Sequence, residues 1–323
     1  MAKLRLVLAI GHYDRLVPLL DGTVSAEGID LTVLAVGQSV PARDGSRRHE
    51  RMLQGEFDAA EIGISPYVMV KARGAPFTAI PIFPRRLFSQ SLVYCNRASG
   101  IQTPADLIGR KVAVRSYQNS LCILFRGDLE HVYGVPWKAV HWVTSGPEPI
   151  EFDLPPDVNV ERASEGRSIA DCLLSGEVDA LAMPHPPAAV VTGEPKVARL
   201  FPEAAAEEAR YFKSFGYPIM HLIAFKDDVL RRYPWAARSL FDAFERAFTV
   251  ARDYYSDPNW SMLPWGPQAR ERQESLLGSD PWPNGVAKNQ ANMERFMALA
   301  REQGVISRTL SMEEMFHAST LDT

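Results

Sequence analysis

Two ten-residue segments, 53–62 (LQGEFDAAEI) and 174–183 (LSGEVDALAM), constrain the fold of this chain more than any other feature. They share Leu, Gly, Glu, Asp and Ala in register. In each copy we expect a helix to end at the glycine, Gly55 or Gly176, because glycine takes the left-handed conformation of a helix end with little strain. A strand should follow the aspartate. We interpret the repeat as two similar α/β lobes, and two unrelated helix–strand junctions are the alternative.

The rest of the chain alternates short apolar runs with helical patterns, which indicates βαβ units on parallel sheets. A proline- and acid-rich segment, 144–157, is expected to be an irregular loop. The polar segment 43–54 should be helical near its end. The other expected strands are 4–10, 29–36, 57–64, 77–82 and 111–115, and the other expected helices are 16–20, 66–73, 121–133 (with Ser116 as N-cap) and 236–255.

Composition excludes several classes of protein. Apolar residues make up 46% of the 323 residues, as in ordinary globular chains. The net charge of −4 and the lack of a basic run argue against nucleic-acid binding. Three cysteines, widely spaced, suggest neither a disulfide framework nor a metal site. No apolar run is long enough to span a membrane, and the run 6–10 is too short for a secretory signal, so we expect a soluble cytoplasmic protein.

Polar side chains with useful chemistry gather just after the expected strands. In open α/β sheets, ligands lie outside the carboxyl ends of the strands. The segments that follow the strands are therefore the candidate site: 11–14, 63–67, 84–86, 115–120 and 183–185. Their chemically active side chains are His12, Asp14, Ser65, Arg85, Arg86, Arg115, Tyr117, Asn119, Ser120 and His185.

Each candidate also has a structural interpretation. Arg85 and Arg86 could bind a carboxylate with a guanidinium fork, and we expect one of them to face the ligand and the other not to. The segment 116–120 could bind an anion at a helix start, or Ser116 could simply cap that helix. His12, His185 and His221 could transfer protons, although a lone histidine is more often structural.

Glu61 near the end of an apolar strand is an unusual acid. It is either tucked into the ligand site, where burial would raise its proton affinity, or paired with a cation. No Cys/His spacing in the sequence supports a metal site. A divalent metal would need ligands from distant loops, and the sequence does not exclude such a site. Dinucleotide, P-loop and nucleophile-elbow motifs are absent.

With these residues identified, the sequence resembles the 4,5-dihydroxyphthalate decarboxylase family along nearly its whole length. The resemblance rests on the following motifs: Tyr13-Asp14-Arg15, Leu20-Asp21-Gly22, Glu27-Gly28-Ile29-Asp30-Leu31, the stretch 61–67, Pro81-Ile82-Phe83-Pro84-x-Arg86-x-Phe88, Tyr117-Gln118, Arg126-Gly127, His141-Trp142-Val143-Thr144, Gly176-Glu177-x-Asp179-Ala180, Pro218-Ile219-Met220-His221 and Trp282-Pro283-x-Gly285.

The resemblance implies an α/β fold of the type II periplasmic-binding-protein kind. Such a fold has two lobes, each a mostly parallel sheet flanked by helices, with the ligand cleft between them. Lobe I would comprise 1–95 and 221–323, and lobe II 96–220. The family also implies a homo-oligomer that removes CO2 from a hydroxylated aromatic acid, its only small-molecule partner, without an organic cofactor.

Roles for the residues follow from the chemistry that this resemblance implies. Arg86 or Arg85, and Arg115 with the helix start at Asn119 and Ser120, would hold carboxylate. His185 or His12 would be the acid–base group. The groups that orient the phenol or the histidine would be Asp14, Glu61 and Tyr117, and further contacts to the substrate would come from Ser65, Tyr67 and His221.

Three segments depart from the family pattern and leave other interpretations open. The chain has Ser89-Gln90 where the family has Arg-His, Arg115-Ser116 where it has Pro-Glu, and Met183-Pro184-His185 where it has Ala-Pro-Arg. A related decarboxylase for another aromatic acid is therefore one alternative. A non-catalytic binding protein for an aromatic carboxylate, used in transport or sensing, is the other, because this fold serves mostly binders.

Overall fold

The computed structural model describes residues 3–37 and 48–323, which form two compact units. The first unit comprises Met1–Arg86, Ile219–Met293 and Leu310–Thr323, and the second Leu87–Pro218 and Glu294–Thr309. The chain therefore passes between units at 86/87, 218/219, 293/294 and 309/310, where the sequence analysis expected only 95/96 and 220/221. The segment 294–309, expected in lobe I, belongs to the second unit.

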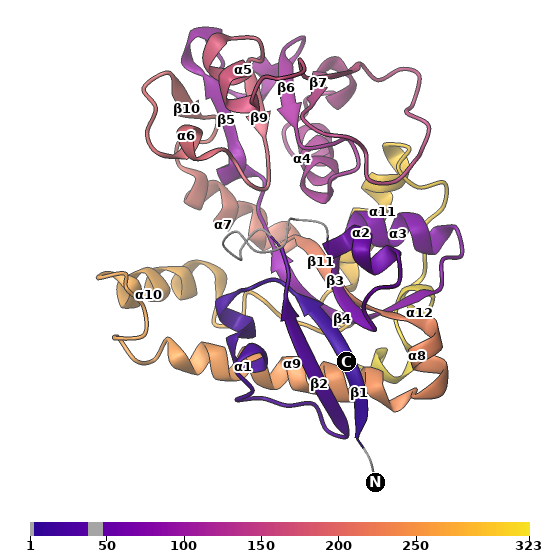
Figure 1. The fold of residues 1–323 in the computed structure, drawn as a ribbon. Helices are drawn as coiled ribbons and strands as arrows, with labels where there is room; N and C mark the ends of the chain where they lie inside the picture. The colour runs from indigo at the N-terminus through magenta and orange to yellow at the C-terminus, as the bar shows by residue number, and fades with distance from the viewer. Residues whose placement is uncertain (1–2, 38–47) are drawn as a thin grey trace. The chain divides into compact units, whose positions relative to one another are not determined.

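The first unit has a five-stranded sheet in the order β2-β1-β3-β11-β4 (Figure 1). Strands β1, β2 and β3 are parallel, and β11 runs antiparallel to β3 and β4. The strands are β1 (Leu4–Ile10), β2 (Ile29–Ala35), β3 (Ala59–Gly63), β4 (Phe77–Arg86) and β11 (Ile219–Lys226). The helices are α1 (Val17–Leu20), α2 (Arg48–Leu53), α3 (Ile64–Ala72), α8 (Asp227–Arg232), α9 (Trp235–Tyr254), α10 (Gly266–Leu277) and α12 (Met312–Met315).

The second unit has a six-stranded sheet in the order β10-β5-β9-β6-β7-β8. Strands β9, β6, β7 and β8 are parallel, and β5 is antiparallel to its neighbours β9 and β10. Its strands are β5 (Val93–Asn96), β6 (Lys111–Val114), β7 (His141–Thr144), β8 (Val160–Arg162), β9 (Ala180–Ala182) and β10 (Val197–Arg199). Its helices are α4 (Ser120–His131), α5 (Ile169–Ser175), α6 (Ala188–Val191) and α7 (Ala204–Phe215), together with most of α11 (Gln290–Glu302).

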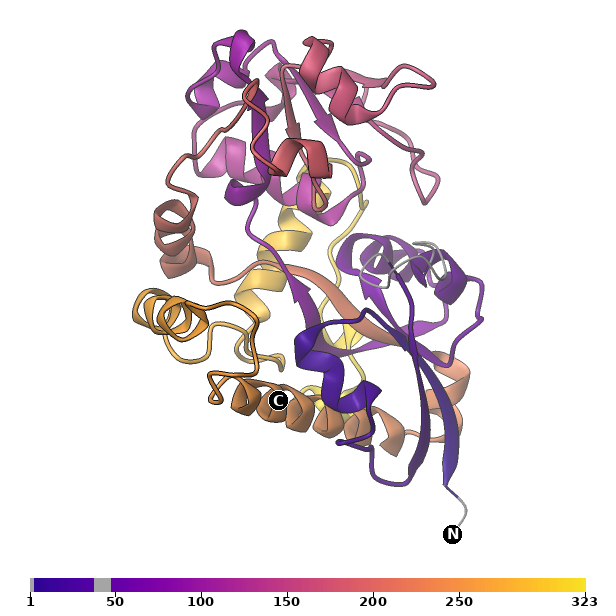
Figure 2. The ribbon, with the colours of Figure 1, turned by 60° about the vertical axis from the view of Figure 1, so that its left-hand side comes forward.

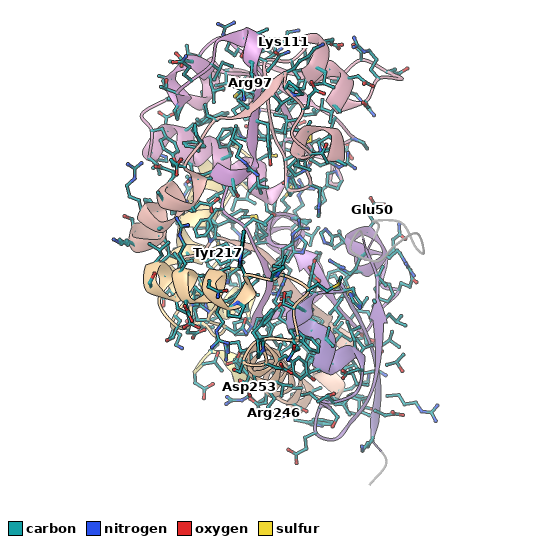
Figure 3. The ribbon with its side chains drawn as sticks, turned by 90° about the vertical axis from the view of Figure 1, so that its left-hand side faces the viewer. Glu50, Arg97, Lys111, Tyr217, Arg246 and Asp253 are labelled. Carbon is teal, nitrogen blue, oxygen red and sulfur yellow. The ribbon has the colours of Figure 1, made fainter. Side chains whose placement is uncertain are left out.

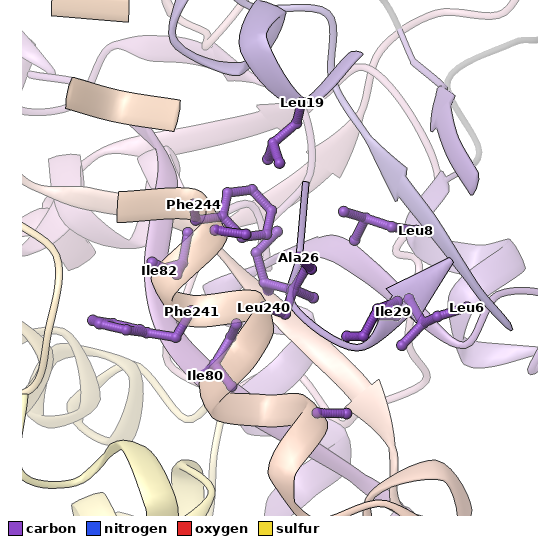
Figure 4. Close-up of a cluster of buried hydrophobic side chains, with 14 of the residues drawn as sticks. Leu6, Leu8, Leu19, Ala26, Ile29, Ile80, Ile82, Leu240, Phe241 and Phe244 are labelled. Carbon is purple, nitrogen blue, oxygen red and sulfur yellow. The ribbon is translucent and has the colours of Figure 1, made fainter. Parts of the chain in front are cut away.

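The core of the first unit lies between its sheet and α9 (Figures 1, 2 and 4). Helix α9 buries residues at three- and four-residue spacing, such as Leu240, Phe244 and Phe248, against Leu8 and Ile80 of the strands. Charged residues occupy its opposite side, including Arg246 and Asp253 in Figure 3. This amphipathic pattern is why the segment forms a helix that covers a sheet.

The two copies of the sequence repeat have matching structures. Gly55 and Gly176 have φ of +79° and +83° after helices α2 and α5, as expected. Asp58 accepts a hydrogen bond from the Val7 N–H of β1 at 2.9 Å, and its own N–H donates to the Val7 carbonyl at 3.1 Å. Asp179 makes the same pair of bonds with Lys111 of β6, both at 2.9 Å. The aspartate therefore fixes the start of a central strand in each unit.

We predict that Asp58→Ala and Asp179→Ala each lower the free energy of unfolding by about 1–2 kcal/mol, because each leaves a strand N–H without its carboxylate. Urea titration measures the change. Asp58→Asn and Asp179→Asn are the controls, since the amide oxygen can still accept the bond and the loss should be smaller. Equal stability of the alanine and wild-type proteins would contradict this role.

Several element boundaries differ from expectation for local reasons. Strand β4 extends to Arg86, so Arg85 and Arg86 lie within it and not after it. Asn119 is the N-cap of α4, because its side chain accepts the N–H of Leu121; the expected Ser116 cap was wrong. The helix expected near the end of 43–54 is α2, and 43–47 lie outside the described residues.

Within the described chain, no helix is both long and apolar enough to cross a membrane.

Candidate active site

Glu61 is a fully buried acid in the middle of the sheet of the first unit. It lies in β3, whose five residues are all buried. The equivalent residue of the repeat is Ala182, also the third residue of its strand, so the fold itself does not require an acid at this position. Since an unpaired buried carboxylate is strongly unfavourable, Glu61 must have strong partners.

Four donors converge on the Glu61 carboxylate. The Gly11 N–H, which follows β1, donates to Oε2 at 2.8 Å. The Tyr13 hydroxyl and the Arg48 guanidinium contact Oε1 at 3.1 and 2.9 Å, and His221 Nδ1 also bonds to this oxygen. Burial opposes the charge, but Arg48, His221 and the Gly11 N–H together hold the pKa of Glu61 well below its usual range. Glu61 is therefore a permanent anion that orients its neighbours.

Arg48 and Tyr13 are held in place by this carboxylate. Arg48 is also buried, and its other nitrogens donate to the Glu61 carbonyl, at 3.0 Å, and to the Val36 carbonyl. Burial and then the Glu61 charge raise the pKa of Tyr13, so its hydroxyl keeps the proton that it donates.

His221 occupies the central position of the cluster. It lies in β11 opposite Gly63 of β3 on one side and Arg85 of β4 on the other, and the β11–β4 register shifts on both sides of it. Such bulges re-aim side chains and are common beside active sites. Because a carboxylate only accepts hydrogen bonds, Nδ1 must be the donor to Glu61, which leaves the lone pair on Nε2. No other hydrogen bond of His221 is found among the described residues, and 11% of its side chain is exposed.

His221 is a neutral base at physiological pH. Burial lowers its pKa to about 4; the Glu61 bond partly offsets this, and the charges of Arg85 and Arg48 add to it. His49 of α2 lies edge-on to His221, with ring centroids 4.9 Å apart. Burial and then the neighbouring His221 hold the pKa of His49 well below its usual range too. Two neutral imidazoles, one with a fixed tautomer, therefore lie within the electrostatic reach of the Arg85 guanidinium.

The lowered pKa predicts a pH-dependent stability. Unfolded His221 takes up a proton below about pH 6.5, whereas the folded residue stays neutral until about pH 4. The stabilisation is therefore complete above pH 6.5 and is lost as pH falls to 4, amounting to about 3 kcal/mol. Urea titration gives the difference in unfolding free energy between wild type and His221→Asn. This difference should change by about 3 kcal/mol between pH 7 and pH 4. A difference that does not change with pH would contradict the buried neutral histidine.

Gly11 makes room for the Tyr13 ring. A methyl group on Gly11 would lie 2.4 Å from Cζ of Tyr13 and 2.6 Å from its hydroxyl. We predict that Gly11→Ala displaces this hydroxyl from Glu61 and lowers kcat about as much as Tyr13→Phe, because both remove the same donor. Steady-state kinetics of the two variants provides the check. Full activity of Gly11→Ala alongside a slow Tyr13→Phe would contradict this coupling.

The structure brings three of the sequence-predicted residues together and places the others of the first unit elsewhere. Glu61, His221 and Arg85 are neighbours. Arg86 is buried, and its guanidinium donates to the Pro283 carbonyl at 2.6 Å and to Asn289 at 2.5 Å. Tyr67 is buried, and its hydroxyl bonds to backbone groups of Met315 and Ala79. Ser65 is buried in α3, His12 is exposed, and exposed Asp14 bonds to Arg15 and Tyr255.

The remaining predicted residues belong to the second unit. The backbone N–H groups of Tyr117 and Gln118 donate to the two carboxylate oxygens of Glu148, at 2.5 and 3.0 Å. The sequence analysis expected an anion to bind at this helix start. In this structure the Glu148 carboxylate of the same chain is that anion. Tyr117 is buried and donates its hydroxyl to the Gln303 carbonyl at 2.9 Å, while Asn119 caps α4. Ser120 is buried, and Arg115 and His185 are exposed.

Sequence reasoning missed Tyr13, Arg48 and His49. Arg48 lies 13 residues before Glu61 and His49 lies far from His221 in the sequence, so no local spacing links them. One signal was available: a buried acid demands a cation, and the run 47–51 (Arg-Arg-His-Glu-Arg) closely precedes β3. Among the described residues, no three His, Cys, Asp or Glu side chains are grouped so as to hold a metal ion.

Comparison with solved structures shows the fold. The periplasmic aliphatic sulphonate binding protein SsuA from Escherichia coli matches over 99% of both chains, with a TM-score of 0.59 and 14% identity. SsuA from Xanthomonas axonopodis pv. citri, bound to MOPS, matches with a TM-score of 0.54 and 15% identity over 99% of this chain and 97% of that one. The desulfurization enzyme DSZB matches with a TM-score of 0.51 and 16% identity over 98% of both. The fold is therefore that of periplasmic binding proteins, as expected, and the ligand position between lobes stays a prediction.

Comparison with characterised sequences shows the family. No protein-family model matches the chain. The 4,5-dihydroxyphthalate decarboxylase of Comamonas testosteroni is 34% identical over 335 aligned positions, which cover 100% of this chain and 99% of that protein. The Pseudomonas putida protein of the same name is 33% identical over 67% of this chain and 84% of its own length. This chain belongs to the 4,5-dihydroxyphthalate decarboxylase family of carboxy-lyases.

Proposed function

We propose that this protein removes one carboxylate from 4,5-dihydroxyphthalate, or from a closely related dihydroxylated aromatic acid, without an organic cofactor. The observation that carries the proposal is the Glu61–His221 pair beside Arg85, in a chain that shares a third of its sequence with decarboxylases of this name. A fixed neutral imidazole next to a guanidinium provides a base and an anion anchor together.

The substrate determines what the site must supply. Each carboxylate of 4,5-dihydroxyphthalate lies para to a hydroxyl group. When a base takes that phenolic proton, the oxygen feeds electrons into the ring, and the carbon that bears the carboxylate can accept a proton. The carbon–carbon bond then breaks and CO2 leaves. Its electron pair restores the aromatic ring and the phenolate oxygen, which takes its proton back from the base. The net reaction consumes one proton and gives 3,4-dihydroxybenzoate and CO2.

The residues of the cluster suit these steps. His221 Nε2 is the base for the phenolic proton, and Glu61 holds its tautomer and stabilises the imidazolium that forms. Arg85 anchors a carboxylate. His49, edge-on to His221, is the candidate relay to the ring carbon: it is neutral at rest, so it must first take up the proton that the net reaction consumes and can then donate it. Tyr13 and Arg48 act through Glu61 as positioning residues. Burial keeps bulk water from the cluster, which favours departure of an otherwise well-hydrated carboxylate.

The test is incubation of the purified protein with 4,5-dihydroxyphthalate and a panel of hydroxylated phthalates and benzoates, without added organic cofactor. We expect one CO2 for each 3,4-dihydroxybenzoate formed. In D2O the product should carry deuterium at the ring carbon that lost its carboxylate. Saturable binding of the panel without any CO2 would favour a binding protein for aromatic carboxylates. Turnover of another member of the panel alone would correct the substrate.

A further inference from the structure

Strand β4 is irregular just before Arg85, the residue that anchors a carboxylate in the proposed function. The strand pairs Arg85 with His221 of β11 and Ile80 with Ile223, so residues 81–84 stand opposite a single residue of β11. All four are buried. Backbone groups in such a bulge need partners other than the neighbouring strand. The groups that supply these partners also fix how Arg85 and His221 face each other.

The segment between α10 and α11 supplies partners for the middle of the bulge. The side-chain oxygen of Asn284 accepts the Phe83 N–H at 2.9 Å. The indole N–H of Trp282 donates to the Phe83 carbonyl at 2.7 Å. The last carbonyl of the bulge, that of Pro84, has its partner in another part of the chain.

That partner is Arg15, which lies shortly after β1. Its Nε donates to the Pro84 carbonyl at 2.6 Å. Its guanidinium carbon lies 4.2 Å from the ring centroid of Tyr13 and 4.3 Å from that of Trp282, both within cation–π range. One guanidinium nitrogen pairs with the Asp14 carboxylate at 3.1 Å. Because this carboxylate balances its charge, Arg15 suits a positioning role better than that of a second carboxylate anchor.

Arg15 connects two sides of the Glu61 cluster. On one side it covers the ring of Tyr13, whose hydroxyl donates to Glu61 at 3.1 Å. On the other side it holds the carbonyl of Pro84, which directly precedes Arg85 in the chain. A planar guanidinium can lie over aromatic rings and donate from its edge at the same time, whereas the compact ammonium of lysine cannot.

We propose that Arg15 is a positioning residue for the decarboxylation, which aims both Tyr13 and Arg85. The inference rests on the proposed function, since it concerns turnover of the same substrate by the same cluster. Through Tyr13, Arg15 affects the base that Glu61 orients, and so kcat. Through β4 it affects the contact of Arg85 with the carboxylate, and so KM.

The first test is steady-state kinetics of Arg15→Lys with 4,5-dihydroxyphthalate. This change keeps the charge but loses the planar group. We expect kcat to fall about 10-fold, less than the roughly 100-fold that a misplacement of about 1 Å can cost. KM should rise about 3-fold, because a less well aimed Arg85 keeps only part of its bidentate bond to a carboxylate.

Arg246→Lys is the matched control for this test. Arg246 also donates to a backbone carbonyl of the first unit, that of Ser25 at 2.7 Å, but it lies outside the Glu61 cluster. Its replacement should leave kcat and KM unchanged. Circular dichroism checks that each variant is folded.

The second test is a double-mutant cycle with Tyr13→Phe, which keeps the ring and removes only the hydroxyl. If Arg15 affects kcat through that hydroxyl, Arg15→Lys should lower kcat by less than about 2-fold in the Tyr13→Phe background and should still raise KM about 3-fold. A purely structural role predicts another pattern, because loss of folded enzyme would lower kcat equally in both backgrounds and leave KM unchanged. Arg15→Met, which keeps the apolar stem against the rings, gives the same comparison if Arg15→Lys does not fold.

The results separate this inference from the proposed function. Unchanged kcat and KM in Arg15→Lys, or an equal loss of kcat in both backgrounds of the cycle, would overturn the inference while the decarboxylase function stands. Failure of both Arg15 variants to fold would make Arg15 a structural residue and would overturn it too. A wild type that releases no CO2 would refute the proposed function, and this inference with it.

Discussion

Replacing His221 by asparagine should lower kcat by about 10²- to 10⁴-fold, the usual contribution of a positioned acid–base group. The asparagine amide can still donate to Glu61 from near the place of Nδ1, but it has no basic atom in place of Nε2. The variant should therefore fold and bind substrate with a KM close to that of wild type. Steady-state CO2 release together with thermal unfolding measures both effects.

His131→Asn is the matched control for this experiment. His131 is on the surface of the second unit, where its ring pairs with Glu302 at 2.8 Å and about half of its side chain is exposed. Its loss should leave kcat and KM unchanged. If His221→Asn retained wild-type turnover, His221 would be a structural residue of β11 and the proposed base would have to be another group.

Replacing Glu61 by glutamine should be strongly destabilising as well as inactivating. The change leaves Arg48 as a buried cation without its anion, and breaking a buried ion pair in this way costs about 3–5 kcal/mol. The glutamine amide can also turn its NH2 group toward His221 and so fail to fix the Nδ1–H tautomer. Urea titration and kcat at pH 7 measure the two effects.

A double variant separates stability from chemistry. Glu61→Gln with Arg48→Met removes both charges and should recover part of the lost stability, although the Val36 and Glu61 carbonyls then lose their donor. Activity should not recover, because the imidazole is still not held. Glu56→Gln is the control, since Glu56 pairs with Arg51 at the surface and its loss should change stability far less. If the double variant were fully active, Glu61 would have no role in positioning His221.

The fold was largely predictable because its signals are local. The glycine and aspartate of the repeat act within a few residues of each other, and the structure reproduces that junction in both units. The length of β4 was not predictable, since Pro84, Arg85 and Arg86 interrupt an apolar run. The placement of 294–309 depends on buried partners such as Arg295 with Asp128, 2.8 Å apart, which lie 167 residues apart in the sequence.

The candidate site was only partly predictable because its contacts join distant segments. Glu61 was singled out as an acid near the end of an apolar strand and His221 as a histidine near a strand end, and the hydrogen bond between them joins positions 160 residues apart. The rule that ligands lie just after strands selected Arg86 and Tyr67, whose side chains bond to backbone groups instead. The departure Ser89-Gln90 illustrates the limit: Ser89 donates to the buried Asp128 at 2.9 Å, so these residues belong to the internal network of the second unit.

Single-turnover release of CO2 from carboxyl-labelled 4,5-dihydroxyphthalate, with wild type and His221→Asn compared at pH 7, tests the central claim most directly. We predict one equivalent of CO2 from wild type, and from the variant a rate at least 100-fold slower with an unchanged dissociation constant for the substrate. Equal rates from the two proteins, or tight binding by wild type with no CO2, would contradict a decarboxylase that works through the Glu61-oriented His221.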